Sequence, residues 1–335
     1  MRRVLLLAVQ AAITIGILIL VFHDAEKRAQ MAAALGSAKW YWLVCALLAA
    51  GAVEALGGIR WRILLGIQGI HVSWLTATGQ LLIAVFFNLV SPGLIGGDAI
   101  RMIYVMSENP RRKSGVVAAV VMDRTMGLAS LLVLAAASLL VRRSWLSQTP
   151  NTARLAATTA IILAVGFAFV AIIFVIASLH LRIPQRLPFR SQLQSAIDSL
   201  NRFRGHVQKC ITAFAVTLAA HGAFYVSYFF AAQAFRDSEE HLPSLGEMFT
   251  IMPIVNTLVA MPVTIAGVGV REAIFQTLLG DLVHTTRSVA VLIGSTGFLC
   301  WAFWGLLGGA LFVAFPPKPF RGAVTKSPLV SASSA

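Results

Sequence analysis

The chain has 335 residues, of which 58% are hydrophobic and only 12% charged, and its mean hydropathy is +0.81. Soluble domains carry about 25% charged residues, so the composition excludes an ordinary soluble domain and indicates a helical protein that crosses a membrane several times. The net charge of +14 fits an excess of basic residues in cytoplasmic loops. Nucleic-acid binding is not expected, because the sequence has no basic stripe with interleaved aromatic residues.

Long apolar stretches predict about six full membrane spans, each near the roughly 20 residues that cross a bilayer core. In chain order they lie near residues 4–22, 40–58, 114–141, 155–179, 210–235 and 288–315. We interpret the first as a retained helix, because it lacks a convincing small-x-small cleavage site. The three cysteines are far apart, and no histidine belongs to a cluster with metal-ligand spacing. No disulfide framework, metal site or cofactor is therefore expected.

Two further apolar runs each end in the same short pattern. A proline is followed by isoleucine three residues on, glycine five on and arginine nine on, starting at Pro92 and again at Pro262. Proline and glycine interrupt a helix, and non-helical backbone at membrane depth is tolerated only where protein or a watery cavity surrounds it. Both copies are therefore candidate transport-site elements. The residues expected to form these breaks are Pro92, Gly93, Gly96, Gly97, Pro262, Gly267 and Gly269.

The pattern allows kinked full spans or re-entrant hairpins, the latter near residues 73–107 and 245–283. With hairpins and both termini cytoplasmic, sixteen basic residues fall inside and eight outside, as the positive-inside rule requires. The two hairpins then enter from opposite faces, which is the inverted-repeat architecture of alternating-access transporters. We therefore predict an all-α, polytopic helical membrane protein with two re-entrant hairpins in an inverted-topology repeat.

Residues 190–209 repeat apolar side chains at helical spacing, with basic side chains between them. This pattern fits an amphipathic helix that lies on the cytoplasmic leaflet, and equally a basic helix that packs on the protein. Residues 316–335, rich in Pro, Ser and Ala, are expected to be a disordered cytoplasmic tail. Residues 1–315 then form a single transmembrane domain.

Charged residues at apolar depth are expected to pair, because an unpaired charge at the bilayer centre costs about 2.5–3.5 kcal/mol. Seven such residues remain once the loops are assigned: Glu54, Asp98, Arg101, Asp123, Arg124, Arg271 and Glu272. Neighbours on a helix point about 100° apart. We therefore expect Asp123 to pair with Arg101 while Arg124 turns to a different helix. Glu54 is interpreted as structural, and His221 as a hydrogen-bonded interior histidine.

The two motif arginines, Arg101 and Arg271, are the leading candidates for binding an anion. Each follows a break from which a new helix begins, so the positive end of that helix and a forked guanidinium could hold the same group. The alternative is that these charges form salt bridges that only hold the hairpins. The candidate substrate-binding residues are Arg101, Arg271, Asp98, Glu272, Asp123, Arg124, Asn88, Ser91 and Asn256.

Three motifs carry a family resemblance: SPGLIGGDAIR at 91–101, VMDRTMGL at 121–128 and GVGVRE at 267–272. Together, and in this order, they resemble the flippase-like membrane family related to the transmembrane region of lysylphosphatidylglycerol synthase, over roughly residues 5–315. In multiple peptide resistance factors such a region is associated with moving an aminoacylated phospholipid between leaflets, and a separate cytosolic domain makes that lipid. The chain ends about twenty residues after its last span, so synthase activity is not expected.

The resemblance implies a lipid translocase of the bacterial cytoplasmic membrane that handles a lipid with an anionic or zwitterionic head group. No Walker-type loop is present, so ATP-driven transport is not expected. Two alternatives stay open. One is a membrane-embedded lipid-modifying enzyme that uses the intramembrane acids, and the other is a non-catalytic partner of an envelope or lipid-synthesis enzyme. A homo-oligomer is also left open.

Overall fold

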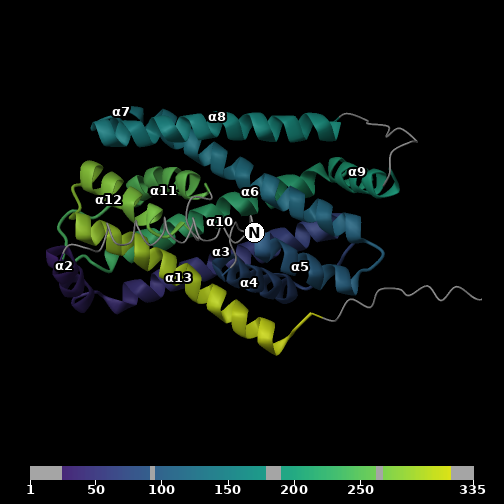
Figure 1. Cartoon of the computed structure of the whole chain (residues 1–335), viewed down its shortest axis with the longest axis horizontal. Helices are drawn as coiled ribbons and strands as arrows, with labels where there is room; N and C mark the ends of the chain where they lie inside the picture. The colour runs from purple at the N-terminus through teal and green to yellow at the C-terminus, as the bar shows by residue number, and fades with distance from the viewer. Residues whose placement is uncertain (1–24, 91–94, 179–189, 262–266, 318–335) are drawn as a thin grey trace, which may run out of the picture.

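The computed structural model describes residues 25–90, 95–178, 190–261 and 267–317 (Figure 1). Within these ranges the chain forms twelve helices and no strand, so the predicted all-α class is confirmed for the described part. Several predictions lie outside the described residues. They are the first span at 4–22, the motif residues Ser91, Pro92, Gly93 and Pro262, and the tail from residue 318 onward.

Five helices are long and apolar enough to cross a membrane, and they correspond to the five spans predicted after residue 25. α8 runs along the upper edge of Figure 1, and α13 crosses its lower part. α10 packs along α3, where the Ser227 hydroxyl donates to the Ala46 carbonyl at 2.9 Å. The five helices are α3 (Trp40–Ile67), α6 (Lys113–Val141), α8 (Pro150–Ser178), α10 (Val207–Gln233) and α13 (Arg287–Ala314).

α3 is longer than the sequence suggested. We expected the span to end near residue 58, with Arg60 and Arg62 among the cytoplasmic loop charges, but the helix continues to Ile67. Arg60 therefore lies inside a helix, where its guanidinium meets Asp123. A charge with a buried partner need not end a membrane helix, because the pairing offsets its desolvation.

The first repeated pattern joins two short helices that fold back on each other. They are α4 (Trp74–Val90) and α5 (Ile95–Glu108), of 17 and 14 residues. The Asn88 side chain at the end of α4 accepts the Gly97 N–H of α5 at 3.0 Å. Gly97 also has no room for a side chain, because a Cβ there would overlap the Ala84 carbonyl and Asn88. The glycine of the motif is thus required by the close approach of the two helices.

The second pattern joins α11 (Leu245–Val259) to α12 (Val270–Leu282), of 15 and 13 residues. Gly267 has a φ of +74°, and a Cβ on it would overlap Val259. Gly269 has a φ of +86° and precedes the first residue of α12. Both glycines adopt the left-handed conformation that other residues avoid, so they set the turn that starts α12. Both helix pairs occupy the ranges predicted for hairpins, and each of their helices is shorter than a full span. We call α4 with α5 the first hairpin and α11 with α12 the second; their re-entrant course in a membrane and their inverted topology stay predictions.

Three smaller helices complete the described part: α2 (Ala25–Gly36), α7 (Arg143–Leu146) and α9 (Arg190–Arg204). α9 is the amphipathic segment, and it packs on α6. Its Phe203 is buried in one cluster with Val116 and Ala119 of α6. The backbone carbonyl of Ser199 accepts the Gln68 side-chain amide at 2.8 Å. α9 thus packs on the protein, and its position on the cytoplasmic leaflet stays a prediction.

α13 contacts both hairpins through glycines. Gly305, Gly308 and Gly309 face α4, and a Cβ on Gly308 would overlap the backbone of Leu82. Nearer its start, Gly294 lies against the Phe275 ring of α12. Small residues at such contacts let helices in a membrane approach closely, where packing replaces the hydrophobic effect as the driving force.

Candidate functional site

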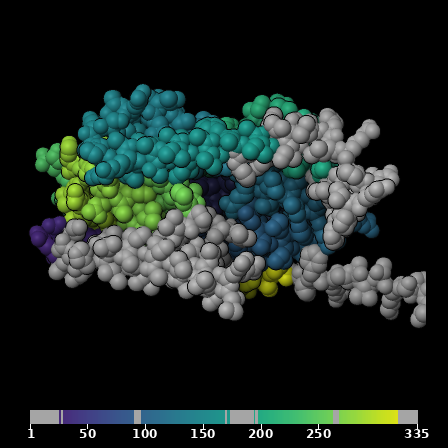
Figure 2. Space-filling model, turned by 45° about the horizontal axis from the view of Figure 1, so that its top comes forward, coloured from purple at the N-terminus to yellow at the C-terminus, as the bar shows by residue number. Residues whose placement is uncertain are grey.

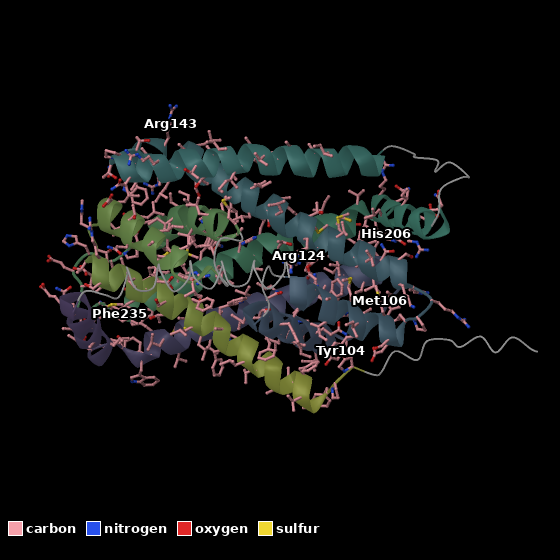
Figure 3. The ribbon with its side chains drawn as sticks, in the orientation of Figure 1. Tyr104, Met106, Arg124, Arg143, His206 and Phe235 are labelled. Carbon is pink, nitrogen blue, oxygen red and sulfur yellow. The ribbon has the colours of Figure 1, made fainter. Side chains whose placement is uncertain are left out.

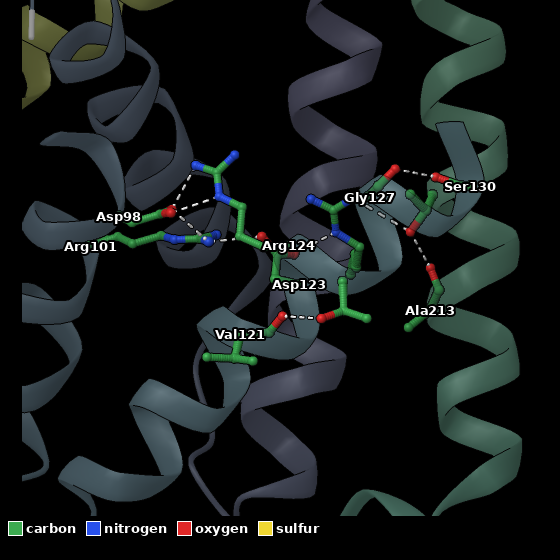
Figure 4. A network of polar contacts seen from close by, with 11 residues as sticks. Asp98, Arg101, Val121, Asp123, Arg124, Gly127, Ser130 and Ala213 are labelled. Carbon is green, nitrogen blue, oxygen red and sulfur yellow. Dashed lines mark hydrogen bonds and ion pairs between the residues drawn. The ribbon is translucent and has the colours of Figure 1, made fainter. Parts of the chain in front are cut away.

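A cluster of charged residues joins the first hairpin to α3 and α6 (Figure 4). Asp123 of α6 is 4% exposed and lies between two arginines. Its Oδ1 is 2.6 Å from Nε of Arg60, and its Oδ2 is 2.8 Å from Nη2 of Arg101. The predicted pairing of Asp123 with Arg101 is therefore confirmed, and the structure adds Arg60 as a second partner.

Asp98 of α5 forms the other half of the cluster. Arg124 donates from Nε to its Oδ2 at 2.6 Å and from Nη2 to its Oδ1 at 2.8 Å, and Arg101 approaches Oδ1 at 2.9 Å. The expectation that Arg124 turns to a different helix is therefore wrong, because Asp123 and Arg124 both reach α5. Arg101 is almost fully buried, and its guanidinium lies 4.4 Å from the ring centre of Trp61. Three guanidinium groups thus share two carboxylates, which leaves this cluster with one net positive charge.

The charged pair of the second hairpin is arranged differently. Glu272 accepts the Gly269 N–H at 2.7 Å and the Ser295 hydroxyl at 3.2 Å, so its carboxylate caps the start of α12 and favours that helix end. Arg271 is buried, with its guanidinium 4.5 Å from the ring centre of Phe298 on α13. The acid therefore holds the helix start, and the arginine beside it faces inward.

A cavity of about 570 Å³ lies between the two hairpins and the long helices. In Figure 2 a hollow separates the yellow-green part of α12 from the blue part that holds α5 and α6. Figure 3 places Arg124 near the middle of the molecule, whereas Arg143 lies at its edge. The polar residues that line the cavity are Glu54, Arg60, Asn88, Arg124, Thr217, His221, Asn256, Arg271 and Trp301.

The sequence was compared with known protein families and with curated proteins. It matches the family described as the lysylphosphatidylglycerol synthase TM region over residues 7–315. The chain belongs to this family. No curated protein matches it. Membership of the lysylphosphatidylglycerol synthase TM family fits a membrane function related to lipids, and it confirms the resemblance that the three motifs carried.

Four of the nine predicted binding residues line the cavity of this family member: Asn88, Arg124, Asn256 and Arg271. Asn88 lies near the end of α4 and Asn256 near the end of α11, so each asparagine precedes the break of its own hairpin. Arg101, Asp98, Asp123 and Glu272 stand behind the lining, where they orient Arg60, Arg124 and α12. Ser91 lies outside the described residues.

Sequence reasoning missed Arg60 as a site residue and gave Glu54 no role in the cavity. Trp301 donates from Nε1 to Oε1 of Glu54 at 3.0 Å, and Arg60 donates from Nη1 to Thr217 at 3.4 Å. The overlooked signal was the apolar run after Arg62, from Ile63 to Ile67, which extends the helix past both arginines. The lysylphosphatidylglycerol synthase TM region of this chain therefore places three arginines and one acid at the cavity wall, and the acids that pair with Arg60 and Arg124 stand behind it.

Proposed function

We propose that the protein is a lipid translocase of the bacterial cytoplasmic membrane, and that the cavity between the hairpins receives the head group of a phospholipid. The supporting observation is the lining itself, in which Arg60, Arg124 and Arg271 face one space with a single acid, Glu54. Asp123 and Asp98 balance Arg60 and Arg124 from behind the lining, but guanidinium groups that face the cavity have further N–H donors for an anion that enters it. A phosphate group is the anion that every phospholipid carries, and forked arginine side chains suit its geometry.

Arg124 is the residue best placed to exchange partners. Its side chain is 49% exposed on the protein surface and lines the cavity, while Asp98 holds it through two hydrogen bonds. A phosphate that enters the cavity takes over donors from Asp98, and Asp98 keeps Arg101 as its partner. The head group is then held by guanidinium groups while the acyl chains stay in lipid. The inverted arrangement of the two hairpins, with both termini cytoplasmic, supplies alternating access in this proposal.

Reconstitution tests the proposal directly. The full-length protein is incorporated into liposomes that contain a trace of fluorescent phosphatidylglycerol or phosphatidylcholine, and a membrane-impermeant quencher reports how fast the labelled lipid changes leaflet. We expect faster transfer than in protein-free liposomes, with phosphatidylglycerol favoured because of its net negative charge. Extraction and chromatography of the lipids after the assay check that the lipid is chemically unchanged.

The two alternative functions give different results in the same experiment. A new lipid species after incubation would indicate a lipid-modifying enzyme and overturn the translocase proposal. Unchanged lipid with transfer no faster than in empty liposomes would also overturn it, and would favour a non-catalytic partner of a lipid-synthesis enzyme. Arg236→Gln is the matched control for substitutions in the cavity, because this arginine is exposed and is not part of the cavity lining.

A further inference from the structure

A second polar cavity, of about 360 Å³, lies where α9 packs against the start of α6. It shares no lining residue with the central cavity. Its walls come from the turn after α3, the loop between α5 and α6, and one face of α9. Two of these segments carry the basic residues that the positive-inside rule places at the cytoplasmic surface, where phospholipid head groups and soluble phosphate esters are both at hand.

Three arginines and one acid line this second cavity: Arg111, Arg112, Arg202 and Asp198. The lining therefore carries two net positive charges, which matches a phosphate group. Arg112 is held in place, because its Nη1 donates to the Gln68 carbonyl at 3.0 Å. A guanidinium has five N–H donors, so this bond leaves the fork able to bind an anion as well.

The start of α6 adds to the positive potential of the cavity. α6 is 29 residues long, and its N-cap residue, Arg112, makes no side-chain capping hydrogen bond. Ser114 and Gly115, in the first turn of the helix, line the cavity. The amino end of a long helix favours a negative group within about one turn.

A buried oxygen in the cavity wall indicates the other feature of the ligand. Gln68 is fully buried, and its Oε1 has no hydrogen-bond partner among the described residues. The amide is fixed by its Nε2, which donates to the Ser199 carbonyl at 2.8 Å. A buried acceptor without a donor is unfavourable, because it has lost its hydrogen bonds to water. A ligand with a hydroxyl or ammonium group next to its phosphate would satisfy Gln68 and the arginines together.

We propose that this cavity binds a phosphate ester that carries a hydrogen-bond donor, and that the bound ester fastens α9 to α6. The chemistry is shared by two sources, the head group of an inner-leaflet phospholipid and a small soluble ester such as glycerol 3-phosphate. The site is separate from the proposed transport cavity, so it stands even if the protein moves no lipid.

Thermal unfolding of the full-length protein in a neutral detergent tests the site, with ionic strength held constant. Glycerol 3-phosphate is titrated in one arm and phosphatidylglycerol, in mixed micelles, in the other. The test variant is the double substitution Arg111→Gln with Arg202→Gln, and the matched control is Arg62→Gln with Arg204→Gln. All four arginines are exposed, but only the first two line the cavity. Each variant is compared with itself, with and without ligand, so that a lower basal midpoint does not obscure the result.

We expect at least one probe to raise the unfolding midpoint in a saturable way, and the test variant to bind it about tenfold more weakly or worse because charge-assisted hydrogen bonds are lost. The control variant should keep wild-type affinity. Stabilisation by glycerol 3-phosphate identifies a soluble ester as sufficient, and stabilisation by phosphatidylglycerol alone identifies the lipid. Sulfate, which lacks a donor at neutral pH, should stabilise less. The proposal is overturned if neither probe raises the midpoint, if the control loses the effect equally, or if sulfate acts as well as the ester.

Discussion

Asp98 and Arg124 form a forked ion pair from α5 to α6, with two N–H···O distances of 2.6 and 2.8 Å. The next residue back on α6, Asp123, pairs with Arg101, which is the next turn of α5. The same two helices are therefore tied twice, with the acid and base exchanged between them. Because adjacent residues of α6 point about 100° apart, they reach α5 at two different places. Two ion pairs at different places along α5 fix the orientation of the first hairpin against α6, in addition to the attraction between the charges.

Replacing Asp123 with asparagine should strongly destabilise the protein. Arg60 and Arg101 would then lose the carboxylate that lies between them. Breaking a buried ion pair from one side costs about 3–5 kcal/mol. The protein is heated in detergent, and size-exclusion chromatography then measures the fraction that stays folded at each temperature. Asp237→Asn is the control, because Asp237 pairs with Lys39 at the surface, where a salt bridge contributes about 0–1 kcal/mol. Equal stability of the two variants would contradict the central role of Asp123.

A double-mutant cycle should separate the two partners. We expect Asp123→Asn and Arg101→Gln to couple by about 0.5–3 kcal/mol, as residues in direct contact do. The cycle of Asp123→Asn with Arg124→Gln should give a much smaller coupling, because Arg124 is bonded to Asp98 instead. A larger coupling of Asp123 with Arg124 than with Arg101 would contradict the pairing seen in the structure.

The two motif arginines should respond differently to lysine. Arg271 lines the cavity, so Arg271→Lys should slow lipid transfer by about tenfold or more while the protein still folds, because the forked geometry is lost. Arg101 lies behind the lining between two carboxylates and the Trp61 ring, so Arg101→Lys should lower stability first. Transfer rates in liposomes and unfolding midpoints in detergent are measured on both variants. Normal transfer by Arg271→Lys at normal expression would remove Arg271 from the proposed site.

The sequence predicted the helices and the two breaks better than it predicted the cavity. The breaks could be predicted because they depend on local residue types: a turn with positive φ favours glycine, as at Gly267 and Gly269. Charge pairing was also predictable, because membrane-buried charges require partners. Arg60 was missed because its role depends on Asp123, 63 residues away. The cavity depends on seven helices that pack together, and local patterns in a single sequence do not predict that packing.

Gly308→Ala should be destabilising out of proportion to the single methyl group it adds. A Cβ at this position would overlap the Leu82 backbone, which cannot move aside as a side chain can. Overpacking of this kind costs about 1–3 kcal/mol. Gly79→Ala, in α4, is the matched control, since a Cβ there has no atom within 4 Å and alanine favours a helix. Unfolding midpoints of the two variants measure the difference, and a neutral Gly308→Ala would contradict the close contact of α13 with α4.

Cysteine labelling tests the predicted topology. In a background without Cys45, Cys210 and Cys300, Ser238→Cys should react with a membrane-impermeant reagent added outside the cell, and Glu108→Cys should not. Both positions are exposed, so protein packing does not protect either one. Permeabilised cells give the control in which both positions react. External labelling of Glu108→Cys would place the end of the first hairpin outside and remove the inverted repeat.

One helix, α13, touches both hairpins, at positions fourteen residues apart: Gly294 lies against α12 and Gly308 against α4. At 1.5 Å per residue these contacts are about 21 Å apart along the same rigid axis. A tilt of α13 about a point between them swings the two contacts in opposite directions. In the translocase that we propose, such a tilt would widen the space at one hairpin while it narrows the space at the other.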